Sequence, residues 1–114
     1  MSMQKLMEEL AFDSFAQEIR PELGADSIEL NHMYFDEPSD PACLHIGLVN
    51  DYALVQIVFW EGGNLELISI QPPDSDNARK SEFNNAGRKR LEEVVHLSID
   101  WLRNRKSVDS LHSP

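Results

Sequence analysis

Cys43 and His45 are the residues whose types and spacing come nearest to a reactive pair. They lie two positions apart in the apolar run Cys43–Val49, so on a strand their side chains point to the same face. A thiol beside an imidazole is typical of a nucleophile pair or of half a metal site. No further ligands follow at a recognisable spacing, and a free cysteine on an apolar strand is usually an inert small hydrophobe. We therefore expect neither catalysis nor metal binding at this pair.

The other candidates for chemistry have simpler structural interpretations. His32 alternates with Leu30 and Tyr34, which predicts a half-buried, hydrogen-bonded histidine rather than a base. Gly62 and Gly63 precede neither a helix nor a lysine at P-loop spacing, and the sequence has no Gly-x-Ser-x-Gly, His-Glu-x-x-His or Cys-x-x-Cys. We therefore expect no catalytic residue, no metal site and no cofactor, and we interpret the chain as a protein that is not an enzyme.

Composition and charge predict one soluble domain. The chain has 114 residues, 41% of them hydrophobic, and its one cysteine excludes an intramolecular disulfide framework. No apolar run reaches the roughly 18 residues of a membrane span, and the N-terminus lacks a signal-peptide pattern, so we expect a cytoplasmic protein. Residues 1–106 are expected to form a single α+β domain, and residues 107–114 a flexible tail.

The charges are distributed unevenly. The formal net charge is -10; residues 1–77 hold 15 acidic and 2 basic side chains, whereas residues 78–114 hold 5 acidic and 8 basic ones. An acidic surface repels nucleic acid and anionic membranes and attracts basic partners. The basic cluster between residues 79 and 90 lacks the interleaved aromatic residues that stack bases, so we expect a solvated helix face or intramolecular ion pairs there.

The elements that must position these residues are organised around the apolar run Tyr52–Trp60, which has the composition of a central strand. Turn signals separate it from Cys43–Val49 and from Leu65–Ile70, and the alternating segment Ser27–Phe35 comes before them. We expect these four segments to form an antiparallel meander. The prolines and acids of residues 36–41 predict an exposed loop between the first two strands.

The apolar pattern separates the two faces of this sheet. A two-residue turn at Asn50-Asp51 would place Val49 opposite Tyr52 and collect the apolar residues on one core face. That face holds Leu44, Ile46, Leu48, Ala53, Val55, Ile57 and Phe59, and a pairing of Phe35 with Cys43 adds Ile28 and Leu30. The opposite face is mixed: Glu29, Asn31, Met33, Phe35, Cys43, His45, Val49, Tyr52, Leu54, Gln56, Val58 and Trp60. A mixed face of this kind commonly lies against a partner or a second subunit, or under long loops.

The register of the last strand stays open. A bulged three-residue turn would put Leu65 and Leu67 on the core face, whereas a two- or four-residue turn would put Ile68 and Ile70 there.

Amphipathic helices flank the meander. The segment Met3–Leu23 has apolar residues at helical spacing, with an expected break near residues 13–14. Pro21 disfavours continuation of the helix from Arg20, and Gly24 is a natural stop. The final helix is expected at Ser81–Asn104, with Ser81 as its N-cap. Both helices need an apolar surface, and the core face of the meander offers one. The predicted fold class is therefore α+β, a two-layer sandwich in the order α-β-β-β-β-α with both helices on one face.

One hairpin carries a family resemblance. Within Val55–Ile70, a strand ending in Trp60-Glu61 is followed by a turn containing Gly63 and by the alternating segment Leu65-Glu66-Leu67. This hairpin, between N- and C-terminal helices, resembles that of small bacterial immunity proteins that neutralise polymorphic toxins, notably the TriTu type. The resemblance implies toxin binding rather than catalysis.

We therefore interpret the chain as a non-catalytic, inhibitory protein-binding protein, with an immunity protein against a bacterial toxin as the specific hypothesis. Its expected partner is a basic protein, and neither nucleic acid nor a membrane. Aromatic residues dominate interface energetics, which makes Phe35, Tyr52 and Trp60 the predicted anchors on the mixed face. The predicted acidic partner-binding residues, which would steer and pair with a basic surface, are Asp36, Glu37, Asp40, Asp51 and Glu61.

Two other functions remain open. A secretion chaperone for an effector is also small, acidic and α+β, and it would use the mixed face for a homodimer. Such chaperones resemble this chain less, because a middle helix interrupts their sheet. The other alternative is a small enzyme or ligand carrier that uses Cys43, His45 and Gln56.

Overall fold

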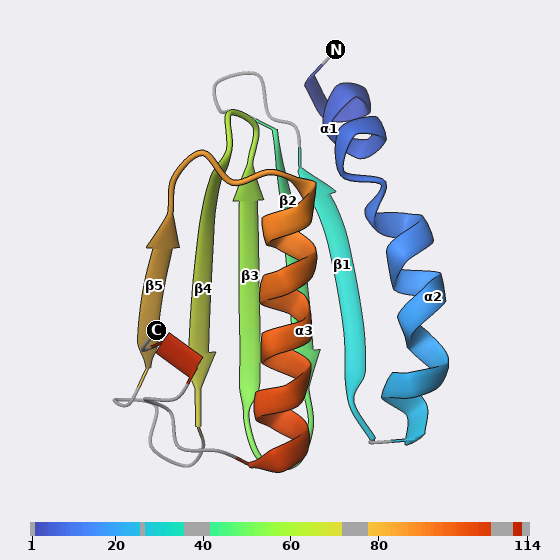
Figure 1. Cartoon of the computed structure of the whole chain (residues 1–114), viewed down its shortest axis with the longest axis vertical. Coiled ribbons are helices and arrows are strands. Elements are labelled where there is room, and N and C mark those ends of the chain that lie inside the picture. The colour runs from blue at the N-terminus through green and yellow to red at the C-terminus, as the bar shows by residue number, and fades with distance from the viewer. Residues whose placement is uncertain (1, 26, 36–41, 72–77, 106–110, 113–114) are drawn as a thin grey trace.

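The computed structural model of the chain describes residues 2–25, 27–35, 42–71, 78–105 and 111–112. It contains α1 (Ser2–Leu10), α2 (Phe12–Ala25), β1 (Glu29–Phe35), β2 (Cys43–Val49), β3 (Leu54–Trp60), β4 (Asn64–Ile70), β5 (Arg79–Phe83) and α3 (Arg88–Asn104). The five strands form one antiparallel sheet in sequence order (Figure 1). The predicted α+β class is therefore confirmed.

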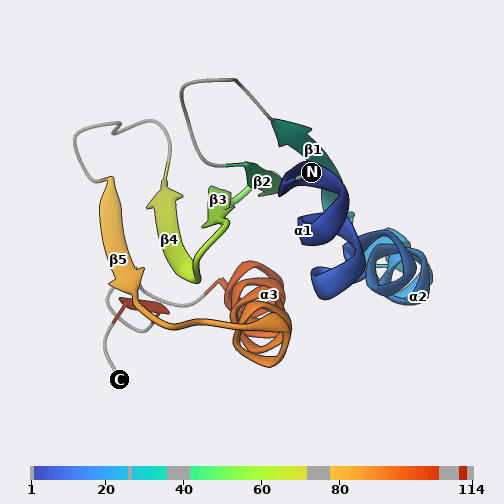
Figure 2. The same cartoon turned by 90° about the horizontal axis from the view of Figure 1, so that it is seen from above.

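All three helices lie on one side of the sheet (Figure 2). The sheet residues that face them form the core, and Leu44, Leu48 and Ile57 are fully buried there. Helix α3 adds Leu91 and Val95, which are also fully buried. The predicted core face is thus confirmed. Within the described residues, no helix combines the length and the apolar content needed to cross a membrane.

The sheet has five strands where we expected four, because Arg79–Phe83 is a strand rather than the start of the last helix. It pairs with β4, with Ser81 opposite Leu67, so Ser81 is a strand residue and not an N-cap. Helix α3 begins at Arg88, and Gly87 is its N-cap. A short, charged strand is a common way to end a sheet, and those charges hid the strand signal in the sequence.

The pairing of Phe35 with Cys43 is as expected, but the next register is not. Val49 lies opposite Leu54 rather than Tyr52, because residues 50–53 form a four-residue loop. The register therefore differs by two residues from the expected one. Side chains alternate with a period of two, so both strands keep their predicted faces.

A three-residue turn joins β3 to β4, which settles the last register in favour of Leu65 and Leu67 as core residues. Gly63 has a φ of +96°, and a side chain there would also approach the Ala86 carbonyl oxygen to 3.0 Å. The Gly63 oxygen accepts a hydrogen bond from the Ala86 N–H at 2.7 Å. The segment between β5 and α3 therefore holds this turn, and with it the end of β3 at Trp60.

The N-terminal helical segment differs from its prediction at the start of α2 and agrees with it at the end. The break lies at Ala11, whose φ is 45°, rather than near residues 13–14. The helix passes through Pro21 and ends at Ala25, next to the stop expected at Gly24. Proline removes one backbone hydrogen bond from a helix, and burial of Ile19 and Leu23 against the core compensates for this loss in the last turns.

The C-terminal residues Leu111 and His112 lie against the sheet, although we expected a flexible tail there. Leu111 packs on the core. The imidazole of His112 lies between two hydroxyls, with Nε2 2.7 Å from Ser69 Oγ on β4 and Nδ1 2.7 Å from Ser81 Oγ on β5. Residues 107–110 and 113–114 of the expected tail lie outside the described part of the chain.

Tyr34 and His32 lie on the helix side of β1, beside α2. The Nε2 atom of His32 is 2.7 Å from Asp13 Oδ1, so the expected half-buried, hydrogen-bonded histidine is confirmed. The Tyr34 hydroxyl is buried close to Asp13. Burial, followed by the negative charge of Asp13, raises the pKa of Tyr34 to about 12.

This pKa predicts a loss of stability in strong alkali. The folded state favours the neutral phenol, so its contribution is fully present below the ordinary pKa of 10.0 and is lost as the pH rises to about 12. Between these values Tyr34→Phe is expected to lose less free energy of unfolding than the wild type. Urea unfolding of both proteins, below and within this interval, measures the difference. Equal losses in the two proteins would contradict the burial of this phenol.

Candidate functional site

The sheet face opposite the helices is here called the open face, because no described helix covers it (Figure 2). Cross-strand pairing arranges its side chains in rows. The first row is Phe35, Cys43, Trp60 and Asn64; the second is Met33, His45, Val58, Glu66 and Glu82; the third is Asn31, Gly47, Gln56, Ile68 and Lys80; the last is Glu29, Val49, Leu54 and Ile70. The β1–β3 side of this face is mainly apolar or neutral, and the β4–β5 side carries charge.

The apolar side contains a hollow, here called the Gly47 hollow, with a volume of about 330 Å³. It forms because Gly47 has no side chain between Asn31 and Gln56 in the third row. Met33, Phe35 and Leu54 contribute apolar walls, and Met33 and Phe35 are 59% and 39% exposed. The ring of His45 packs edge-on against Phe35, with centroids 4.7 Å apart, and so fixes this wall. The hollow can receive an apolar side chain.

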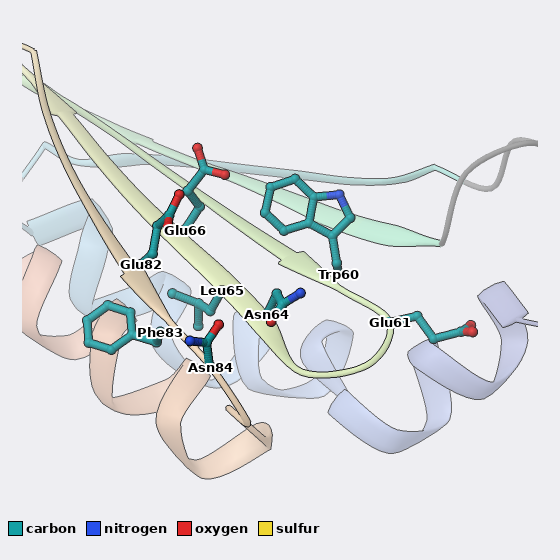
Figure 3. Close-up of a pocket in the computed structure, with 8 residues that line it drawn as sticks. All are labelled: Trp60, Glu61, Asn64, Leu65, Glu66, Glu82, Phe83 and Asn84. Carbon is teal, nitrogen blue, oxygen red and sulfur yellow. The ribbon is translucent and has the colours of Figure 1, made fainter.

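The charged side contains a second cavity, here called the Trp60 pocket, with a volume of about 390 Å³ (Figure 3). The indole of Trp60 stands on one side of this pocket, and the side chains of Glu66 and Glu82 stand on the other. Lys80 Nζ is 3.1 Å from a carboxylate oxygen of each glutamate. Glu61 lies at the rim, in the turn that follows β3.

The predicted partner-binding residues fall in three places. Phe35 and Trp60 lie on the open face, in the same row on either side of Cys43. Glu61 lies beside them at the Trp60 pocket. Asp36, Glu37 and Asp40 lie outside the described residues. The remaining two, Asp51 and Tyr52, lie in the loop between β2 and β3, at the opposite end of the strands (Figure 1).

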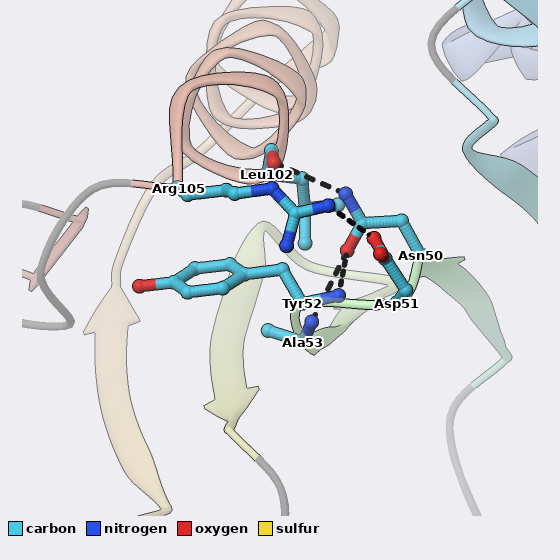
Figure 4. Close-up of polar contacts among 6 residues, drawn as sticks. All are labelled: Asn50, Asp51, Tyr52, Ala53, Leu102 and Arg105. Carbon is cyan, nitrogen blue, oxygen red and sulfur yellow. Dashed lines mark hydrogen bonds and ion pairs between the residues drawn. The ribbon is translucent and has the colours of Figure 1, made fainter.

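Asn50 determines the shape of that loop (Figure 4). Its side-chain oxygen accepts hydrogen bonds from the backbone N–H groups of Tyr52 at 2.9 Å and of Ala53 at 3.1 Å. Its side-chain nitrogen donates to the Leu102 carbonyl oxygen at 3.0 Å. The loop is therefore attached to the end of α3, and it directs the Tyr52 side chain toward the helices.

Tyr52 consequently lies on the helix side, and its expected place on the open face is wrong. Its ring centroid is 5.4 Å from that of Trp101, and the Arg105 guanidinium lies 5.7 Å from the same ring. Asp51 Oδ1 forms an ion pair with Arg105 at 2.5 Å (Figure 4). Tyr52 thus closes the end of the core, and Asp51 pairs with Arg105 at the surface beside it.

Sequence reasoning did not single out Met33, Gly47, Lys80 and Glu82 as site residues. Met33 was placed on the correct face, and its exposure follows from its position near the end of edge strand β1. Gly47 gave a signal, because a glycine inside a strand often marks the close approach of a ligand. Lys80 and Glu82 were missed because β5 was not expected.

Cys43 and His45 are packed among their neighbours on the open face. Cys43 is 8% exposed, between Phe35 and Trp60 in the first row, and His45 packs on Phe35. Within the described ranges, no group of three His, Cys, Asp or Glu side chains is arranged to hold a metal ion. What this face presents to solvent is apolar surface beside carboxylates, which is suited to binding.

Comparisons with known proteins assign no family to the chain. No protein-family model, curated protein or solved structure matched it.

Proposed function

We propose that the chain is a non-catalytic inhibitory protein that binds a basic protein partner through its open face. The observation that carries this proposal is a sheet face that no described helix covers, on which Met33 and Phe35 expose large apolar side chains beside the Gly47 hollow. The resemblance of the Trp60 hairpin to immunity proteins suggests the specific form, an inhibitor that neutralises a bacterial toxin.

The composition of the open face suits a protein partner. Protein interfaces combine an apolar centre that fits into hollows with a polar rim, and a few large side chains supply most of the binding energy. Phe35, Met33 and Trp60 provide such side chains here, and Asn31, Gln56 and Glu66 surround them with polar groups. A sheet face that contacts only solvent usually carries mainly polar residues.

The charge distribution favours a basic partner. The basic residues of α3 are largely paired within the chain: Arg88 with Glu92 at 2.9 Å, Arg90 with Glu93 at 3.3 Å and Arg103 with Glu22 at 2.8 Å. The open face instead carries Glu29, Glu66 and Glu82 with Lys80 as its described cation, and the whole chain has a net charge of -10. Long-range attraction would therefore steer a basic protein to this molecule.

The test is capture of the partner followed by binding and inhibition measurements with purified proteins. The immobilised chain is exposed to an extract of its native host at low and high salt, and retained proteins are identified by mass spectrometry. We expect a basic protein that is lost as the salt concentration rises, and whose toxic activity the purified chain inhibits.

A matched pair of variants ties this partner to the open face. Met33 and Leu97 are similarly exposed, at 59% and 56%, but lie on opposite layers of the molecule. Met33→Ser is expected to weaken binding at least about tenfold, whereas Leu97→Ser leaves it unchanged, because only Met33 borders the Gly47 hollow. Equal effects of the two variants, or a partner without inhibited activity, would contradict the proposal.

The secretion-chaperone alternative requires a dimer through the same face. The sheet runs from β1 to β5 in sequence order, and the described residues between these strands contain no helix, unlike the interrupted sheet expected of those chaperones. Sedimentation of the purified chain distinguishes the two functions. A stable dimer that Met33→Ser dissociates would favour the chaperone and overturn the inhibitor proposal.

A further inference from the structure

The Trp60 pocket holds two carboxylates that share one cation. Lys80 Nζ lies 3.1 Å from Oε1 of Glu66 and 3.1 Å from Oε1 of Glu82. Its hydrogen bonds to Glu66 and Glu82 raise the pKa of Lys80, so its ammonium group is charged at neutral pH. Two carboxylates and one ammonium leave an excess of negative charge in the pocket.

The indole of Trp60 differs in its surroundings from two other aromatic rings of the chain. The guanidinium of Arg90 lies 5.7 Å from the ring of Phe83, and that of Arg105 lies 5.7 Å from the ring of Tyr52. Both rings therefore already have a cation from the chain itself. In the part of the chain that the structure describes, no arginine or lysine lies over Trp60, although tryptophan is the best aromatic partner for a cation.

The pocket thus combines the partly exposed indole of Trp60 with excess carboxylate charge on its opposite side (Figure 3). An arginine side chain matches both features, since its planar guanidinium stacks on an indole and binds carboxylates through paired N–H donors. A lysine ammonium matches the charge but not the planar stacking. The volume of about 390 Å³ lies within the range of about 300–1,000 Å³ typical of small-ligand sites.

We infer that the Trp60 pocket binds an arginine side chain presented by the partner protein, with the guanidinium between the Trp60 indole and the carboxylates of Glu66 and Glu82. This inference rests on the proposed function, and it adds the chemistry by which the basic partner is recognised. The Gly47 hollow and the Trp60 pocket would then act side by side, one for an apolar anchor and the other for a cationic one.

A small probe tests the pocket without the partner. N-acetyl-arginine methylamide is titrated into the full chain while the indole N–H signals are followed by NMR. The chain has two tryptophans, and buried Trp101 on the helix side serves as an internal reference. We expect a saturable shift of the Trp60 signal alone, with a Kd of about 1–10 mM, and at least about tenfold weaker binding of the uncharged citrulline analogue.

Two pairs of charge-removing substitutions locate the site. Glu66→Gln with Glu82→Gln is expected to weaken arginine binding at least about tenfold, because Lys80 then loses both charged partners and repels the guanidinium. The control, Glu92→Gln with Glu93→Gln, removes the same charge from α3 and is expected to change nothing.

The outcomes separate this inference from the proposed function. Absence of a Trp60 shift, an equal shift with citrulline, or an equal effect of the control variant would overturn the arginine pocket. Retained inhibition of the captured partner in that case would leave the open face as the binding surface. Conversely, arginine binding by a chain that inhibits no partner would support the pocket and contradict the inhibitor function.

Discussion

Replacing Trp101 with alanine is expected to lower the free energy of unfolding by about 3–5 kcal/mol, the usual cost of truncating a fully buried tryptophan. The side chain is 1% exposed in α3 and is the largest of the fully buried side chains. Its ring also supports Tyr52, with centroids 5.4 Å apart, so the cavity would extend beneath the loop of residues 50–53. That loop closes the end of the core.

This loss is a large fraction of the 5–15 kcal/mol that stabilises a typical domain of about this size. Urea unfolding followed by circular dichroism measures it. Trp101→Phe keeps most of the buried ring and is expected to cost about half as much or less, which preserves a measurable transition if the alanine variant fails to fold.

Leu97→Ala is the control for this prediction, because Leu97 lies on the same helix but is 56% exposed. Its expected effect is within about 0.5 kcal/mol. If the Trp101→Ala and Leu97→Ala variants had equal stability, α3 would not pack on the sheet through Trp101.

The division of the sheet into two faces could be predicted from sequence, and the register could not. Alternation of apolar residues predicts the face of every side chain on β2 and β3. A shift of the register by an even number of residues, such as the two observed, leaves these faces unchanged. The loop length depended on Asn50, whose side chain bonds to residues on two sides. One of those bonds reaches Leu102, which no local pattern predicts.

The same limit explains the error at Tyr52. In sequence it continues the apolar alternation of β3, and that pattern placed it with Leu54 and Trp60 on the open face. The strand begins only at Leu54, and the loop before it is shaped by its contacts with α3. Tertiary contacts therefore overrode a local pattern of strand residues.

The candidate site was predictable in part for the same reason. Phe35 and Trp60 followed from alternation alone. The Gly47 hollow could not be predicted without the strand register. A missing side chain leaves a hollow only when larger cross-strand neighbours surround it, and the register decides which residues those are. The Trp60 pocket requires β5, a strand whose sequence Arg-Lys-Ser-Glu-Phe has one large apolar residue and therefore little strand signal.

The second large effect is expected from filling the Gly47 hollow. Gly47→Leu is expected to weaken binding of the captured partner at least about thirtyfold, equivalent to about 2 kcal/mol, because the new side chain occupies the space intended for the partner's apolar anchor. The fold should tolerate the change. The backbone of Gly47 is not left-handed, and the nearest atom to an added Cβ, the Asn31 oxygen, is 4.0 Å away.

Gly24→Leu provides the matched control, because it adds the same side chain near the end of α2, where a Cβ meets nothing within 4 Å. Isothermal titration calorimetry of the wild type and both variants against the purified partner measures the effect, and urea unfolding verifies that each variant is folded. Filling a hollow leaves the charges of the molecule unchanged, so any loss of affinity reports on shape rather than on steering. If Gly47→Leu bound as tightly as Gly24→Leu, the partner would not enter the hollow, and the inhibitor proposal would lose the contact on which it depends.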